Sequence, residues 1–180
     1  MKKKIERKVK TKEGVTIELE GTTVKIKGKE GEVEKTFKIQ GIKMEKKEDT
    51  ICISCAKAGK NQKKVMNTVG SIIEAMMKGA NQKYIYELKI CSTHFPITAK
   101  VEGNKFVIKN FLGERKDRIV KIDPEVKIEV KGDKVSIESI NKEKAGQQAA
   151  TIETATRIRN KDRRIFQDGI WIVKKEKGRR

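Results

Sequence analysis

The strongest constraint on the fold is an internal repeat. A shift of 82 positions aligns residues 15–32 with residues 97–114, and 7 of these 18 positions are identical. Ordinary residue frequencies would give about one match by chance. The identical pairs are Thr16/Thr98, Glu20/Glu102, Gly21/Gly103, Ile26/Ile108, Lys27/Lys109, Gly31/Gly113 and Glu32/Glu114. The period is too long for a solenoid, so the sequence predicts a duplicated domain. One copy, with a basic N-terminal arm, lies in residues 1–81, and the other, with a basic C-terminal tail, lies in residues 82–180.

Within each copy, apolar residues first alternate with polar ones and then follow a helical period. The apolar stripes predict one helix per copy, over residues 61–78 with Gly79 as its C-cap and over residues 144–159, each followed by a strand. The fold class predicted is therefore α+β, in two tandem copies of a small domain, each an antiparallel sheet with one packed helix. Alternation predicts strands around tight turns at Gly21 and Gly103 and also at residues 33–39, 51–54, 119–122, 126–130 and 135–140.

The charge of the chain predicts a polyanionic partner. It has 44 Lys and Arg against 25 Asp and Glu, a formal charge of +19, while 36% apolar residues still allow a core. The excess lies at the ends: residues 1–14 carry seven basic side chains against two acidic ones, and residues 159–180 carry nine against three. Aromatic residues make up only 4% of the chain. Because few rings are available to stack on unpaired bases, structured RNA recognised by shape and phosphates is favoured.

Several classes of protein are disfavoured by the sequence. The lysines at the start precede Glu6 and Arg7, where a signal peptide would be apolar. Apolar runs are too short to cross a bilayer. Three cysteines, an odd number, are expected to be reduced thiols, and the expected location is the cytoplasm.

Four residues have spacings that suggest half-sites for zinc: Cys52, Cys55, Cys91 and His94. The segment containing the first two alternates as a strand, which sends residues three apart to opposite faces. We therefore expect no metal, with a zinc-binding RNA-acting module kept as an alternative.

No catalytic constellation is recognisable. His94 is the only histidine, and no nearby Ser, Cys or Asp has a spacing that implies a proton relay with it. The sequence therefore predicts a protein that is not an enzyme and needs no cofactor.

One segment carries a family resemblance. Residues 161–171 read Lys-Asp-Arg-Arg-Ile-Phe-Gln-Asp-Gly-Ile-Trp, and this run resembles the C-terminal signature of the L6 family of large-subunit ribosomal proteins, in its archaeal and eukaryotic form. Residues 94–97, His-Phe-Pro-Ile, and residues 110–114, Asn-Phe-Leu-Gly-Glu, resemble the opening of that family's second domain. Trp171 stands where the family more often has Tyr, and the bacterial Tyr-Lys-Gly-Lys-Gly element is absent.

The resemblance implies a structural role in the large ribosomal subunit, in the cytoplasm. The second domain would bind folded rRNA near the sarcin–ricin loop and the translation-factor site, beside ribosomal proteins of the stalk base, with no membrane or small-molecule partner. Phe166 and Trp171 would pack, and Asp168-Gly169 would turn into the last strand. The residues implied to bind rRNA are Gly146, Gln147, Gln148, Arg157, Arg159, Asn160, Lys161, Arg163, Arg164, Lys174, Lys175, Lys177, Arg179 and Arg180. A free-standing basic nucleic-acid-binding protein is the alternative.

Overall fold

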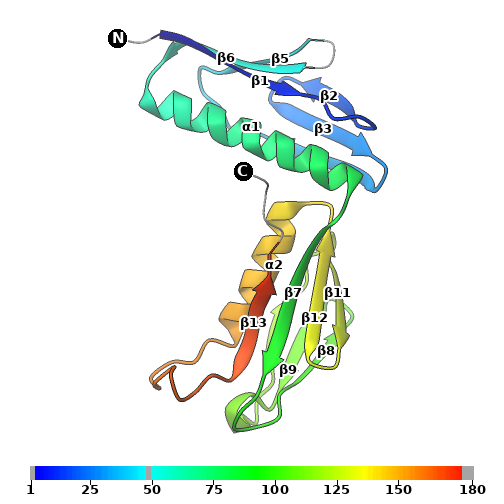
Figure 1. Ribbon diagram of the computed structural model, residues 1–180, viewed down its shortest axis with the longest axis vertical. Coiled ribbons are helices and arrows are strands. Elements are labelled where there is room, and N and C mark those ends of the chain that lie inside the picture. Colours follow the sequence, from blue (N-terminus) through cyan, green and yellow to red (C-terminus); the bar gives the residue numbers. More distant parts are fainter. Residues whose placement is uncertain (1–2, 48–49, 176–180) are drawn as a thin grey trace. The chain divides into compact units, whose positions relative to one another are not determined.

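The computed structural model describes residues 3–47 and 50–175. The chain divides into two compact units, Met1–Lys83 and Tyr84–Arg180, where the sequence placed a boundary after residue 81. Each unit combines antiparallel sheets with one α-helix (Figure 1). The predicted α+β class, in two tandem sheet-and-helix copies, is confirmed.

The first unit has two three-stranded sheets, in the orders β1-β6-β5 and β2-β3-β4, and helix α1. The basic N-terminal segment, taken from the sequence as an arm, forms strand β1 over Lys3–Lys10 and pairs with β6. Alternating Ile5, Arg7 and Val9 turn one face of that strand inward. The elements are β1 (Lys3–Lys10), β2 (Thr16–Glu20), β3 (Thr23–Gly28), β4 (Gly31–Thr36), β5 (Lys43–Lys47), β6 (Thr50–Ala58) and α1 (Lys60–Asn81).

The second unit repeats this plan with one additional strand. Its sheets have the orders β10-β9-β8 and β11-β12-β7-β13. The strand that follows α1 is β7, which begins this unit, whereas β13 follows α2 and returns to pair with β7. The elements are β7 (Tyr84–Cys91), β8 (Thr98–Glu102), β9 (Lys105–Lys109), the 3-10 turn η1 (Phe111–Gly113), β10 (Arg118–Lys121), β11 (Lys127–Lys131), β12 (Lys134–Ser139), α2 (Lys142–Ala155) and β13 (Gly169–Lys174).

The sequence repeat corresponds to a repeated hairpin. Strands β2 and β3 fall on the first aligned segment, and β8 and β9 fall on the second. Gly21 and Gly103 occupy the turns with φ of 60° and 58°. Because side chains other than glycine rarely adopt positive φ, a shared turn geometry explains the identity at this pair.

Both helices differ in extent from the sequence prediction. Gly79 is not a C-cap: α1 continues to Asn81, because Gly79 and Ala80 are buried where the helix packs on the first unit. Helix α2 stops at Ala155 instead of continuing to 159. The carbonyl of Ala155 accepts a hydrogen bond from Arg118 Nη1 (2.6 Å), and the Thr156 hydroxyl bonds the carbonyl of Glu153 (3.1 Å). These bonds satisfy the last carbonyls without another turn of helix.

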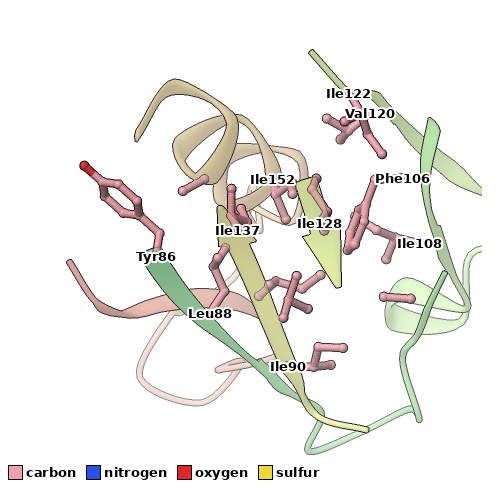
Figure 2. Close-up of a cluster of buried hydrophobic side chains, with 14 of the residues drawn as sticks. Tyr86, Leu88, Ile90, Phe106, Ile108, Val120, Ile122, Ile128, Ile137 and Ile152 are labelled. Atoms are coloured by element: carbon pink, nitrogen blue, oxygen red, sulfur yellow. The ribbon is translucent and has the colours of Figure 1, made fainter. Parts of the chain in front are cut away.

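The core of the second unit lies between α2 and the two sheets (Figure 2). Leu88 of β7, Ile137 of β12 and Ile152 of α2 are buried together with Phe106 and Ile108 of β9. The stripe of α2 that faces the core is narrow, with Ala145 and Ala149 fully buried. In the described part of the chain, neither helix has an apolar stretch long enough to cross a lipid bilayer.

Candidate nucleic-acid interface

A basic loop connects α2 to β13 in the second unit. This cationic loop, residues 156–168, is drawn in orange in Figure 1. Its side chains include four arginines and one lysine against two aspartates. Hydrogen bonds made by a buried side chain at each end pin the loop to the rest of the unit, so its cationic side chains project from a backbone that is held in place.

Asp168 pins the C-terminal end of the cationic loop. Its carboxylate is fully buried and accepts hydrogen bonds from the backbone N–H groups of Thr93 (2.7 Å) and His94 (2.9 Å). The second carboxylate oxygen lies 2.6 Å from His94 Nδ1. An ionised carboxylate can only accept, so Nδ1 carries the proton of this bond.

Thr156 pins the N-terminal end. Its side chain is buried, and its hydroxyl accepts the N–H of Ile170 (3.0 Å) while donating to Glu153. Ile158, two residues further on, is also buried and joins the core. Alternation of buried and exposed positions therefore turns Arg157 and Arg159 outward to solvent.

The environment of Asp168 sets its protonation. Burial by itself raises the pKa of this carboxyl, but the N–H of His94, the His94 side chain and the N–H of Thr93 outweigh it and lower the pKa to about 2 from an ordinary 3.8. Because the pKa is lower in the folded state, the carboxylate stabilises the fold above pH ~4, and this contribution is lost as the pH falls toward 2.

We therefore expect Asp168 to give the second unit an acid-sensitive component of stability. Between pH 4 and pH 2, about 2 kcal/mol of the free energy of unfolding should be lost through this carboxyl. The measurement is urea unfolding followed by fluorescence of Trp171, the single tryptophan, which lies in this unit. The Asp168→Asn variant is the control, because it has no carboxyl to titrate. Equal loss of stability in the two proteins over this pH range would contradict the prediction.

Aromatic rings support the cations of the loop. Phe166 stacks on His94 with 4.6 Å between ring centroids and an angle of 18° between the ring planes. Lys161 Nζ lies 4.3 Å from the centroid of Phe166, and Arg163 Cζ lies 5.7 Å from that of Trp171. Cation–π contacts of this kind orient a charge without neutralising it. Phe166 and Trp171 therefore pack, as the sequence predicted, and their packing places two cations.

Most of the candidate rRNA-binding residues lie on the surface. Arg157, Arg159, Lys161 and Arg163 form no ion pair with an acidic side chain in the described part of the chain. Arg164 instead pairs with Asp162 (2.9 Å), and Lys174 pairs with Glu87 (3.0 Å). The exposed candidates are Gln147, Arg157, Arg159, Asn160, Lys161, Arg163, Arg164, Lys174 and Lys175.

The start of α2 does not match the expected interface. Gln148 is buried, and its amide donates to the carbonyl of Lys121 and accepts from the N–H of Asp123, both at 3.2 Å. Gly146 faces Tyr86, whose hydroxyl would lie 3.2 Å from an added Cβ. The side chain of Gln148 is therefore engaged within the unit, and the interface proposed below is built on the exposed candidates. Lys177, Arg179 and Arg180 lie outside the described residues.

The pairing of His94 with Asp168 was not predicted from the sequence. These residues are 74 positions apart, and nothing in their spacing links them. Pairing of Gly169, the first residue of β13, with Cys91, the last residue of β7, brings them together. The one indication in the sequence was that His94 follows one predicted strand and Asp168 precedes another.

The four candidate zinc ligands are divided between the two units. Cys52 and Cys55 lie on β6 of the first unit, and Cys91 and His94 belong to the second. Within residues 3–47 and 50–175, no three His, Cys, Asp or Glu side chains are grouped closely enough to hold a metal ion.

The fold and the interface define a duplicated α+β protein with a pinned cationic loop on its second copy. Comparison with known proteins specifies the family. Residues 95–169 match the family model described as Ribosomal protein L6. The chain is 44% identical over 170 residues to the large ribosomal subunit protein uL6 of Methanocella arvoryzae, covering 94% of this chain and 96% of the relative.

Other archaeal relatives agree. Identity to uL6 of Methanosarcina mazei is 42% over 175 residues, 97% of this chain and 99% of the relative. Identity to uL6 of Aeropyrum pernix is 42% over 170 residues, 94% of this chain and 93% of the relative. The chain belongs to the ribosomal protein L6 family, as the signature in residues 161–171 indicated.

Proposed function

We propose that this chain is a structural constituent of the large ribosomal subunit that binds folded rRNA through the cationic loop of its second unit. The contact would lie near the sarcin–ricin loop and the translation-factor site, beside ribosomal proteins of the stalk base, in the cytoplasm. The protein performs no chemistry there and neutralises phosphates of a folded RNA.

The pinning of the loop carries this proposal. Arg157, Arg159, Lys161 and Arg163 hold positive charge without acidic partners, on backbone fixed by Asp168 and Thr156. Fixed cations lose little conformational entropy when they contact phosphates, and arginine forms paired hydrogen bonds with phosphate oxygens. Family membership and the names of the relatives support the ribosomal setting.

The test is the salt dependence of binding to large-subunit rRNA. Affinity falls as salt rises, so the slope of log affinity against log salt is negative. We expect the triple variant Arg157→Ala, Arg159→Ala, Arg163→Ala to make this slope shallower by about 2–3, because each lost phosphate contact removes about 0.7–0.9 from its magnitude. Arg164→Ala alone should change the slope less than Arg163→Ala, since Asp162 already neutralises Arg164. Filter-binding titrations at several salt concentrations measure both effects.

A charge-matched control comes from the first unit. Replacing the exposed Lys12, Lys29 and Lys43, which have no acidic partner among the described residues, with alanine removes the same number of unpaired charges and should leave the slope nearly unchanged. If both triple variants flatten the slope equally, binding depends on net charge and the assigned interface is wrong. Equal affinity for duplex DNA and rRNA would favour the free-standing alternative.

A further inference from the structure

A cavity of about 770 Å³ lies between the end of β7 and the cationic loop. Its volume is within the range of small-molecule sites, roughly 300–1,000 Å³. Its lining includes Lys89, Ser92, Thr93, Arg163, Arg164 and Trp171. The hydrogen bonds that hold the loop and the packing of the hydrophobic core do not account for this cavity.

Trp171 forms a fixed aromatic surface in the cavity. Its indole N–H donates to the carbonyl of Gln167 (3.1 Å). Gly169, with φ of 152°, leaves room for the ring, since a Cβ there would lie 3.4 Å from indole Cε2 and Nε1. The ring is therefore held in one orientation before any ligand arrives, which lowers the entropic cost of stacking.

The charges around the cavity favour an anion. Lys89 and Arg163 contribute two cations that have no acidic partner among the described residues, whereas Arg164 pairs with Asp162 and Asp133 is the one acidic side chain in the lining. Ser92 and Thr93 are exposed, and their hydroxyls have no hydrogen-bond partner in the part of the protein that the structure describes. Hydroxyl and guanidinium donors beside an aromatic ring match the phosphate and the base of a nucleotide.

We propose that this cavity binds a single unpaired nucleotide of an RNA, with its base against Trp171 and its phosphate at Arg163 and the hydroxyls of Ser92 and Thr93. The proposal rests on the RNA-binding function above and specifies one contact within it. An RNA nucleotide is favoured over a free one because Arg163 and Arg164 also belong to the cationic loop, so flanking phosphates would meet Arg157 and Arg159. Trp171 is the one aromatic side chain among the described lining residues, so the cavity can stack a single base.

A cavity that binds one unpaired nucleotide should make the protein prefer RNA in which one base projects from the helix. We expect a hairpin with one bulged adenosine in its stem to bind about ten-fold more tightly than the same hairpin fully paired, the scale of one stacked base. The bulged hairpin should also quench the fluorescence of Trp171, the single tryptophan, whereas the paired hairpin should not. The wild-type full-length protein suffices for this comparison.

Two variants assign the effect to the ring. Trp171→Leu should abolish the ten-fold preference, so that this variant binds the bulged and the paired hairpin with equal affinity, and Trp171→Phe should retain most of the preference. Thermal unfolding of each variant checks that β13 remains folded. Retention of the preference in Trp171→Leu, or equal binding and equal fluorescence of the two hairpins with wild-type protein, would overturn the proposal.

The same titrations separate this proposal from the RNA-binding function itself. Loss of salt-dependent binding to the paired hairpin in the double variant Arg157→Ala, Arg159→Ala, which leaves the cavity lining intact, concerns the cationic loop, and loss of the bulge preference alone in Trp171→Leu concerns the cavity. Adenosine 5′-monophosphate serves as the free probe, with no saturable quenching expected up to about 1 mM. Saturable quenching by this nucleotide without a bulge preference would assign the cavity to free nucleotides and overturn the RNA contact.

Discussion

Replacing Asp168 with alanine is expected to destabilise the second unit by about 3–5 kcal/mol. The substitution leaves the N–H groups of Thr93 and His94 without their carboxylate acceptor, and it removes the partner of the His94 ring. An unsatisfied buried donor costs about 1–3 kcal/mol, and bonds to a charged acceptor lie toward the upper end. The stacking of His94 on Phe166 would also lose its support.

Urea unfolding followed by fluorescence of Trp171 measures this change. Asp168→Asn retains one acceptor oxygen and should lose less stability than Asp168→Ala. Asp162→Ala, at an exposed aspartate of the same loop, should change the free energy of unfolding by less than about 0.5 kcal/mol. Similar losses for Asp162→Ala and Asp168→Ala would show that the buried acceptor is not what stabilises the unit.

Replacing Gly28 with alanine is expected to destabilise the first unit by about 3 kcal/mol. An added Cβ would lie 2.5 Å from the carbonyl oxygen of Ala80 and 2.7 Å from its carbonyl carbon. Both are backbone atoms, so β3 and the end of α1 would have to separate. The same carbonyl accepts the N–H of Glu30 at 2.9 Å, and that bond would be strained as well.

Circular dichroism of the helices during thermal unfolding follows this change, since the single tryptophan lies in the other unit. The neighbouring substitution Lys29→Ala, at an exposed position, is the matched control and should have little effect. An unfolding curve for Gly28→Ala that coincides with that of Lys29→Ala would show that β3 and α1 can move apart at little cost.

The fold class was predictable because its signals are local. Alternation at Ile17 and Leu19 reports the two faces of a strand, and the stripe through Ile73 reports one face of a helix. Strand β5 was missed because Lys43–Lys47 contains one buried apolar residue, Met44, among charged ones. Strand β1 was not predicted, because most of its residues are charged and its alternation of buried and exposed positions is short.

The candidate interface was predictable in part. The basic surplus after α2 and the resemblance in residues 161–171 located the loop, and Arg157, Arg159 and Arg163 are exposed there. Gln148 was misassigned because a sequence does not show whether a polar side chain on a helix faces solvent or a buried carbonyl. Its amide bonds two backbone groups, of Lys121 and Asp123, on a segment distant in sequence.

By itself, the sequence determined the duplication, the α+β class, the family and the sign of the partner's charge. These follow from identity, periodicity and composition, each of which is read along the chain. Only the tertiary structure decided that Asp168 meets His94, that Arg164 is already neutralised and that Trp171 lines a cavity. The first and last of these depend on the pairing of β13 with β7, a contact across about 80 residues whose register is fixed by packing of the whole unit.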